Sequence, residues 1–175
     1  MSAFVKFALS SLVLAAIVYT AALFALPSAI MSVAISKIGQ GGANNVFIHS
    51  PLPTSEARGV VRPSPDLAYS VCIIDLSKGP MHISVPLTAP YTSVALYATN
   101  TDNYFVRNDR DTGGKSLDVI VVAPGAEKPA AIPEGAELVE APSAKGLVLV
   151  RRVVESADAF AAIDETRKSS VCAPL

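Results

Sequence analysis

An uninterrupted apolar run near the N-terminus constrains this chain more than any other feature of its sequence. Between residues 7 and 36 no side chain carries a charge, and the centre of the run, residues 7–26, consists mainly of Ala, Leu, Val, Ile and Phe. A helix needs roughly 20 such residues to cross the hydrocarbon core of a bilayer. The run therefore predicts one transmembrane helix, with residues 7–35 in contact with the lipid bilayer.

Two other interpretations of the run compete with a signal anchor. A buried core helix is disfavoured because the run is too long and too uniformly apolar. A cleaved signal peptide has an apolar core of about 7 to 15 residues and a small-x-small cleavage site. Ser32-Val33-Ala34 is such a site, but the uncharged stretch before it is already too long. Residues 1–40 are therefore predicted to stay on the mature chain as an uncleaved anchor.

The chain beyond the anchor is acidic. The whole chain has a formal net charge of -1, to which Lys6 and Lys37 contribute +2 as the only charged side chains of the first 40 residues, so residues 41–175 have a net charge of -3. Nucleic acids are bound through basic surfaces. Nucleic acid is therefore not an expected partner.

Short runs of β-favouring residues, separated by turn residues, repeat through residues 67–175, which are predicted to form a β-rich domain. Residues 41–66 contain four prolines and are predicted to be a linker and a loop that leads into this domain. All but one of the 13 prolines follow residue 40, which favours many short elements over a helical bundle. The predicted strands are 67–74, 81–85, 92–98, 104–107, 117–122 and 147–154; 46–48 is either extended or helical, and 124–134 is a loop.

One helix is predicted after the last strand, over residues 157–169. Ser156 can cap its N-terminus, while Asp158 in the first turn and Arg167 with Lys168 in the last turn complement the helix dipole. These elements together predict a mainly β fold: an antiparallel β-sandwich or barrel-like domain with one N-terminal transmembrane helix and a C-terminal helix.

The densest polar segment, residues 100–111, is the candidate for a ligand site. Its carboxylates and amides could bind a polar ligand. Their alternation resembles part of a calcium loop, but the glycine and the terminal glutamate that such a loop requires are not at the right positions. Asn and Asp are also the residues that turns require, so a purely structural role is the alternative. Asp66 joins the candidates because Pro65 forces a bend beside it. The candidate ligand-binding residues are Asp66, Asp102, Asn103, Arg107, Asp109 and Asp111.

No other pattern in the sequence indicates chemistry. His49 and His82 lack Cys, Asp or Glu at metal-ligand spacing, and no Gly-x-Ser-x-Gly sequence is present. The sequence therefore predicts no metal site and no cofactor, and it identifies no catalytic residue.

Several short motifs resemble one bacterial family. Residues 62–70 read Arg-Pro-Ser-Pro-Asp-Leu-Ala-Tyr-Ser, residues 73–76 read Ile-Ile-Asp-Leu, and Gly79-Pro80 and Val85-Pro86 follow. These motifs resemble the domain of unknown function 1254 family over roughly residues 46–175, and the chain is similar to its short membrane-anchored subgroup. The resemblance implies a bacterial, membrane-associated protein with a β-sandwich-like domain. That family has no established activity, so no catalytic residue is carried over.

The two cysteines, Cys72 and Cys172, both follow the apolar run. If the domain is exported, these thiols are in an oxidising compartment and are expected to form a disulfide. Cys72 shares a face of its strand with the small residues Ala68 and Ser70, which leaves room for the C-terminal helix to lie over that face. The alternative is a free, buried Cys72 and a free Cys172 at the terminus.

The predicted protein is a single-pass protein of the bacterial inner membrane with its C-terminal domain in the periplasm. Lys6 and Lys37 flank the helix, so the positive-inside rule discriminates weakly, and the signal-like start and the cysteine pair favour this orientation. The expected function is a non-enzymatic module that binds another envelope protein. The alternative is an envelope enzyme that uses Asp66 and the carboxylate-rich loop on a polar substrate, which a polar pocket joining them would favour.

Overall fold

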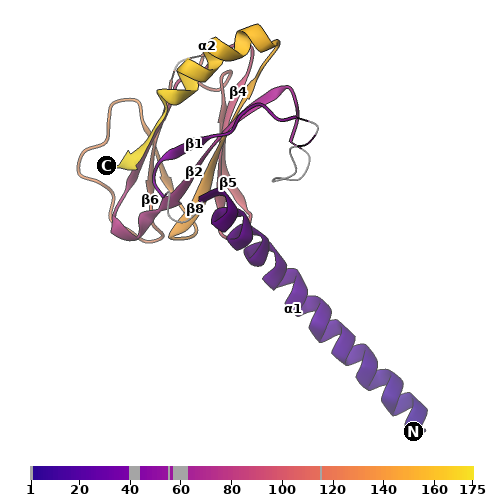
Figure 1. Ribbon diagram of the computed structural model, residues 1–175. Helices are drawn as coiled ribbons and strands as arrows, with labels where there is room; N and C mark the ends of the chain where they lie inside the picture. Colours follow the sequence, from indigo (N-terminus) through magenta and orange to yellow (C-terminus); the bar gives the residue numbers. More distant parts are fainter. Residues whose placement is uncertain (1, 40–43, 55, 57–62, 115) are drawn as a thin grey trace.

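A long helix leads into a two-layered β domain that carries a short helix at its far end (Figure 1). The computed structural model describes residues 2–39, 44–54, 56, 63–114 and 116–175. The elements are α1 (Ala3–Gly39), β1 (Phe47–His49), β2 (Leu67–Asp75), the 3-10 turn η1 (Leu76–Lys78), β3 (Met81–Val85), β4 (Thr92–Ala98), β5 (Asn103–Asn108), β6 (Leu117–Val122), β7 (Glu137–Glu140), β8 (Lys145–Val153), α2 (Ala157–Lys168) and β9 (Val171–Pro174).

The described strands form two sheets. Sheet A has the order β1-β2-β8-β4-β5, and all its neighbouring strands are antiparallel. Sheet B has the order β7-β6-β3-β9, in which β3 is antiparallel to β6 and β9 while β6 and β7 are parallel. In the described part neither sheet closes on itself, so the domain is a mainly β sandwich, as the alternation of the sequence predicts.

The core lies between the two sheets, and β3 shows most clearly how a strand turns its apolar side chains toward it. In β3, Met81, Ile83 and Val85 are fully buried, whereas His82 and Ser84 on the opposite face are half-buried. Burial of such side chains is the main favourable contribution to folding, at about 25 cal/mol per Å² of apolar surface. The buried side chains of sheet A that complete this core include Cys72, Ile74, Val94, Leu96, Phe105, Val148 and Val150.

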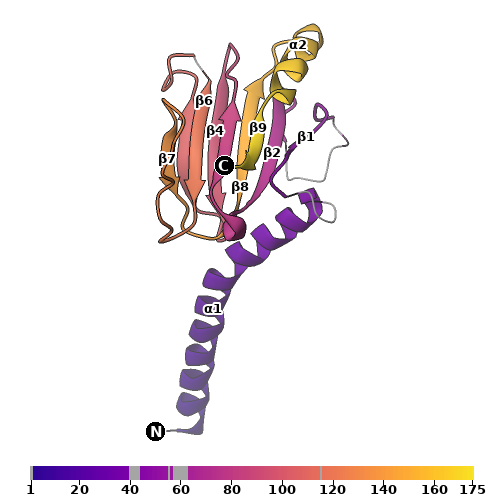
Figure 2. The same ribbon diagram turned by 90° about the vertical axis from the view of Figure 1, so that its left-hand side faces the viewer.

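The outer face of sheet A is covered by the end of α1. Met31, supported by Ile35 and Ile38 of the same helix, packs against Val71 of β2 and Leu147 of β8. Both faces of β2 are thus apolar for different reasons, one facing sheet B and the other facing the helix. The two views agree that the rest of α1 extends away from the domain (Figures 1 and 2).

The C-terminal helix and most strands are where the sequence predicts them, but two short strands are additional. β7 is only four residues long and begins and ends with Glu, and β9 follows α2 almost at once, so neither shows a strong apolar alternation. The parallel pairing of β6 with β7 departs from the expected antiparallel order. Parallel neighbours need a crossover of a dozen or more residues, and residues 123–136 supply it.

The predicted disulfide is present and joins the two sheets. The Sγ atoms of Cys72 in β2 and Cys172 in β9 are 2.00 Å apart, and the Cα atoms are 6.6 Å apart. The expectation that the C-terminal helix lies over Cys72 is wrong, because β9 occupies that position as an edge strand of sheet B. The helix α2 instead packs over Ala68 of the same strand, through Ile163.

Candidate functional site

The structure places the six candidate ligand-binding residues at two opposite ends of the sandwich. Asp102 and Asn103 lie at the start of β5, and Asp109 and Asp111 lie just beyond its end. Residues 104–108 of the strand separate Asn103 from Asp109, so these two residues are about 20 Å apart along the strand. Asp66 precedes β2 at the same end as Asp109, but β8 and β4 lie between β2 and β5. The structure therefore does not bring the six side chains together.

Three of these carboxylates, those of Asp102, Asp109 and Asp111, accept hydrogen bonds from the protein itself. Asp109 accepts a hydrogen bond from the backbone N–H of Thr92 at 3.2 Å, and Asp111 accepts one from the N–H of Asn108 at 2.9 Å. At the other end of β5, Asp102 accepts a bond from the amide of Asn100 at 2.5 Å. The bonds of Asp111 and Asp102 are the local bonds for which turns select Asp and Asn, whereas that of Asp109 joins the end of β5 to the start of β4.

Arg107 joins the two sheets through an ion pair. Its Nε and Nη2 donate to the two carboxylate oxygens of Glu137 in β7 at 3.0 Å and 2.8 Å, and the guanidinium lies 4.9 Å from the ring of Phe105. This bidentate ion pair connects β5 of sheet A to β7 of sheet B at one side of the sandwich.

A buried cationic cluster lies at the end of the sandwich that α2 covers. It consists of Arg152 of β8, Arg167 of α2 and His49 of β1, together with the hydroxyls of Ser70 and Ser170. Arg152 and Arg167 are both almost fully buried. The Nδ1 of His49 is 2.8 Å from the Oγ of Ser70. Of the described groups of side chains, this one combines burial, charge and hydrogen-bonding capacity most strongly.

The sequence carries one signal for this cluster. Val148, Val150 and Arg152 occupy alternate positions of β8, so strict alternation places Arg152 on the core side of the sheet. The side chain of the neighbouring Arg151 lies on the opposite face of the sheet and is half-buried. The position of Arg167 and His49 beside Arg152 depends on the packing of α2 and β1, which no local pattern encodes.

Acidification is expected to destabilise the domain through His49. Burial lowers the pKa of His49 below its ordinary 6.5, with the charges of Arg167, Arg152 and Lys168 adding to this and Asp164 opposing it. The unfolded chain therefore binds the proton at a higher pH than the folded chain does. The contribution of His49 to the free energy of unfolding is present above pH 6.5 and is lost as the pH falls below it. Urea unfolding of the wild type and of His49→Gln between pH 7.5 and 5 measures this loss of stability. An equal decline of the free energy of unfolding in both proteins would exclude His49 as the cause.

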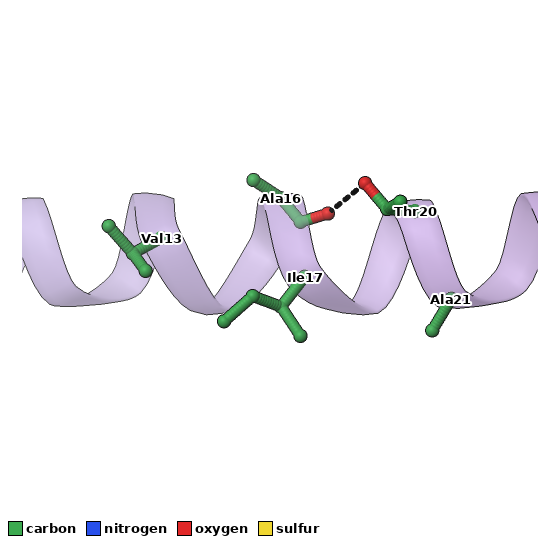
Figure 3. A pocket seen from close by; sticks show the side chains of 5 residues that line it. All are labelled: Val13, Ala16, Ile17, Thr20 and Ala21. Carbon is green, nitrogen blue, oxygen red and sulfur yellow. Dashed lines mark hydrogen bonds between the residues drawn. The ribbon is translucent and has the colours of Figure 1, made fainter.

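Two hollows in the described part lie away from the six candidate residues. One is a shallow groove on the exposed surface of α1, lined by Val13, Ala16, Ile17, Thr20 and Ala21 (Figure 3). The hydroxyl of Thr20 donates to the backbone oxygen of Ala16 at 2.8 Å, so the groove presents an apolar surface. The other has a volume of about 240 Å³ and is lined by Val122, Ala126, Lys128, Leu138 and Glu140.

The first of two similar solved structures supports the same fold. The VPA0106 protein of Vibrio parahaemolyticus is similar over 87% of this chain, with a TM-score of 0.68 and 14% sequence identity. This chain spans 36% of the length of that protein. An uncharacterised protein from Burkholderia cenocepacia is similar over 75% of this chain and 37% of its own, with a TM-score of 0.46 and 16% identity.

Comparison with protein families identifies the domain. No curated protein matches the chain. The sequence profile of the family described as "Protein of unknown function (DUF1254)" matches residues 44–174, which include every described strand of both sheets and the helix α2. The matched region covers well over half of the sequence. The chain therefore belongs to the DUF1254 family.

Proposed function

We propose that this protein is a single-pass protein of the bacterial inner membrane, whose periplasmic β-sandwich is a non-enzymatic module that binds another envelope protein. The observation that carries the proposal is the division of α1 into two parts. Apolar side chains from Phe4 to Ile30 are exposed, whereas Met31 is buried against sheet A. A helix with a long unburied apolar part and a packed end fits an anchor that is fixed rigidly to its domain.

The length of α1 matches this division. Its 37 residues extend over about 55 Å, and a bilayer core of about 30 Å accommodates roughly 20 of them. The remaining turns include Met31 and Ile35, which contact the sandwich. Lipid acyl chains would then cover the exposed apolar groove of Figure 3. The domain would be held close to the membrane surface, with α2 at the end farther from it (Figure 1).

The disulfide supports export of the domain. A bond between Cys72 and Cys172 persists in oxidising compartments such as the periplasm and is rare in the cytoplasm. Together with a helix at the N-terminus that resembles a signal anchor, this favours an N-terminus in the cytoplasm. The carboxylates of Asp109 and Asp111 accept backbone hydrogen bonds, which favours a structural role for them over acid–base catalysis.

Membrane fractionation and intact mass test the anchor. The protein from native membranes is expected to retain residues 1–40 and to stay in the membrane pellet after carbonate washing, because a spanning helix is not released by high pH. Deletion of residues 2–30 is the matched control and should move the domain to the soluble fraction. A native mass short by roughly the first 25 to 35 residues would contradict the proposal by indicating a cleaved signal peptide.

The orientation of the protein across the membrane is tested by a separate measurement. A C-terminal fusion to alkaline phosphatase, which folds to an active enzyme only in an oxidising compartment, is expected to be active in intact cells. A fusion placed directly after Lys6 is the control and should be inactive, because the amino terminus is expected in the cytoplasm. An inactive C-terminal fusion with a stable full-length band would place the domain in the cytoplasm.

A further inference from the structure

The crossover between β6 and β7 folds back over the outer face of sheet B. Val121 packs in the core, so the next residue of β6, Val122, points away from it, yet Val122 is only 3% exposed. Leu138 of β7 lies on the same outer face and is half-buried, because its neighbour Val139 packs against the core. The hollow lined by Val122, Leu138 and the start of residues 123–136 shows that the crossover covers these side chains.

Hydrogen bonds hold the start of the crossover beside the two strands. The backbone N–H of Gly125 donates to Oε1 of Glu140 at 2.8 Å, and the N–H of Ala126 donates to the backbone oxygen of Ala123 at 3.1 Å. The parallel register of β6 and β7 places Glu140 beside Val122 (Figure 2). The crossover and the outer face of sheet B thereby enclose a hollow of about 240 Å³.

The lining of this hollow combines an apolar floor with one positive and one negative group. Val122, Ala126 and Leu138 supply the apolar part, and Lys128 and Glu140 carry the charges. Both charged side chains are exposed to solvent. Within the described part of the chain, Lys128 forms no ion pair and Oε2 of Glu140 accepts no hydrogen bond. The ammonium group and one carboxylate oxygen are therefore free to bind a ligand.

We propose that this hollow binds a free aliphatic α-amino acid, for which leucine is the probe. Its carboxylate would pair with Lys128 and its ammonium group with Oε2 of Glu140, while its side chain would lie on Val122 and Leu138. The two charges of the lining cancel, so Glu140 would repel a fatty acid and Lys128 would repel an amine, whereas a zwitterion is attracted by both groups.

The size of the hollow agrees with this class of ligand. A volume of about 240 Å³ equals that of about eight water molecules, which suits a molecule of the size of an aliphatic amino acid. The hollow is smaller than the sites that hold drug-sized ligands. The site depends neither on the membrane placement nor on the protein partner proposed above.

Calorimetric titration of the detergent-solubilised full chain tests the ligand class. Leucine is expected to bind saturably at one molecule per chain, after subtraction of its heat in empty micelles. Isocaproate lacks the ammonium group, isoamylamine lacks the carboxylate and serine lacks the aliphatic side chain, so each should bind about fivefold more weakly. Leucine that does not bind saturably, or that binds no more tightly than any of these three compounds, would overturn the proposal.

Variants assign each charge of the ligand to its partner. Lys128→Met should weaken leucine binding about fivefold without weakening that of isoamylamine. Glu140→Gln, which retains an acceptor for the N–H of Gly125, should weaken leucine binding about fivefold without weakening that of isocaproate. Lys78→Met and Glu165→Gln remove exposed charges outside the hollow and should bind leucine as the wild type does. An unchanged leucine affinity in either Lys128→Met or Glu140→Gln would refute the assignment.

Methyl NMR spectra locate the bound leucine directly. The methyl signals of Val122 and Leu138 should shift during the titration and saturate at the affinity that calorimetry gives. Shifts confined to other methyl groups, such as those of Val13 and Ile17 on α1, would place leucine elsewhere and would overturn the proposal even if calorimetry detected binding.

Discussion

Replacing Cys72 and Cys172 together by alanine is expected to lower the free energy of unfolding by up to about 4.7 kcal/mol. The bridge spans 100 residues of sequence, and in the chain-entropy model it excludes many conformations of the unfolded chain. Both cysteines are buried, and alanine keeps the Cβ atom of each, so the core loses the two sulfur atoms and no other side-chain atom. Urea unfolding of the full chain in detergent, with and without reductant, measures the effect.

Reductant provides the control for this double variant. The reduced wild type should unfold near the midpoint of the variant, and the variant itself should be insensitive to reductant. Alkylation of the unreduced, denatured wild type should label no thiol. Two labelled thiols in protein prepared from the periplasmic side would contradict both the bridge and the proposed orientation.

Val71→Asp is expected to destabilise the full chain by about 3–5 kcal/mol, because it buries a carboxylate without a partner. Val71 is 8% exposed and lies under Met31 of α1. Val106→Asp is a matched control on the same outer face of sheet A. β5 presents Val106 beside Ala95 of β4, and the side chain is 47% exposed. Surface substitutions of this kind usually change stability by less than about 0.5 kcal/mol.

The comparison of these two valines measures the contact between helix and sheet. The urea concentrations at the unfolding midpoints of both variants, measured in detergent and compared with that of the wild type, give the two changes in stability. A similar small change in both would mean that α1 does not cover Val71, and that anchor and domain move independently. That result would remove the rigid junction on which the proposed membrane placement depends.

Features that depend on neighbouring residues could be predicted from the sequence alone. The apolar run specifies α1 because a helix satisfies its own backbone hydrogen bonds wherever the run lies. Alternation in β3 places Met81 and Ile83 inward, since a strand turns successive side chains to opposite faces. The cap of α2 is equally local: Ser156 accepts a hydrogen bond from the N–H of Ala159 at 3.2 Å.

The arrangement of the candidate site could not be predicted in this way. In sequence, Asp102 and Asp109 belong to one polar segment, but a strand passes between them and carries them to opposite ends of the sandwich. In contrast, His49 and Arg152 are distant in sequence and become neighbours only when β1, β2 and β8 pair. Proximity in a sheet depends on strand order, and strand order is not encoded in any single segment.

The apolar run, the β-rich class of the domain, the C-terminal helix and the pair of cysteines that an exported domain would oxidise can all be read from the amino-acid sequence. Three features required the folded structure: β9 rather than α2 lies over Cys72, the end of α1 covers Val71, and Arg152 is enclosed without a carboxylate partner among the described residues. The two sets differ in the range of the interactions that produce them. Periodicity and capping act within a few residues, whereas sheet pairing and layer packing bring together segments whose contacts are favourable only after long loops have closed.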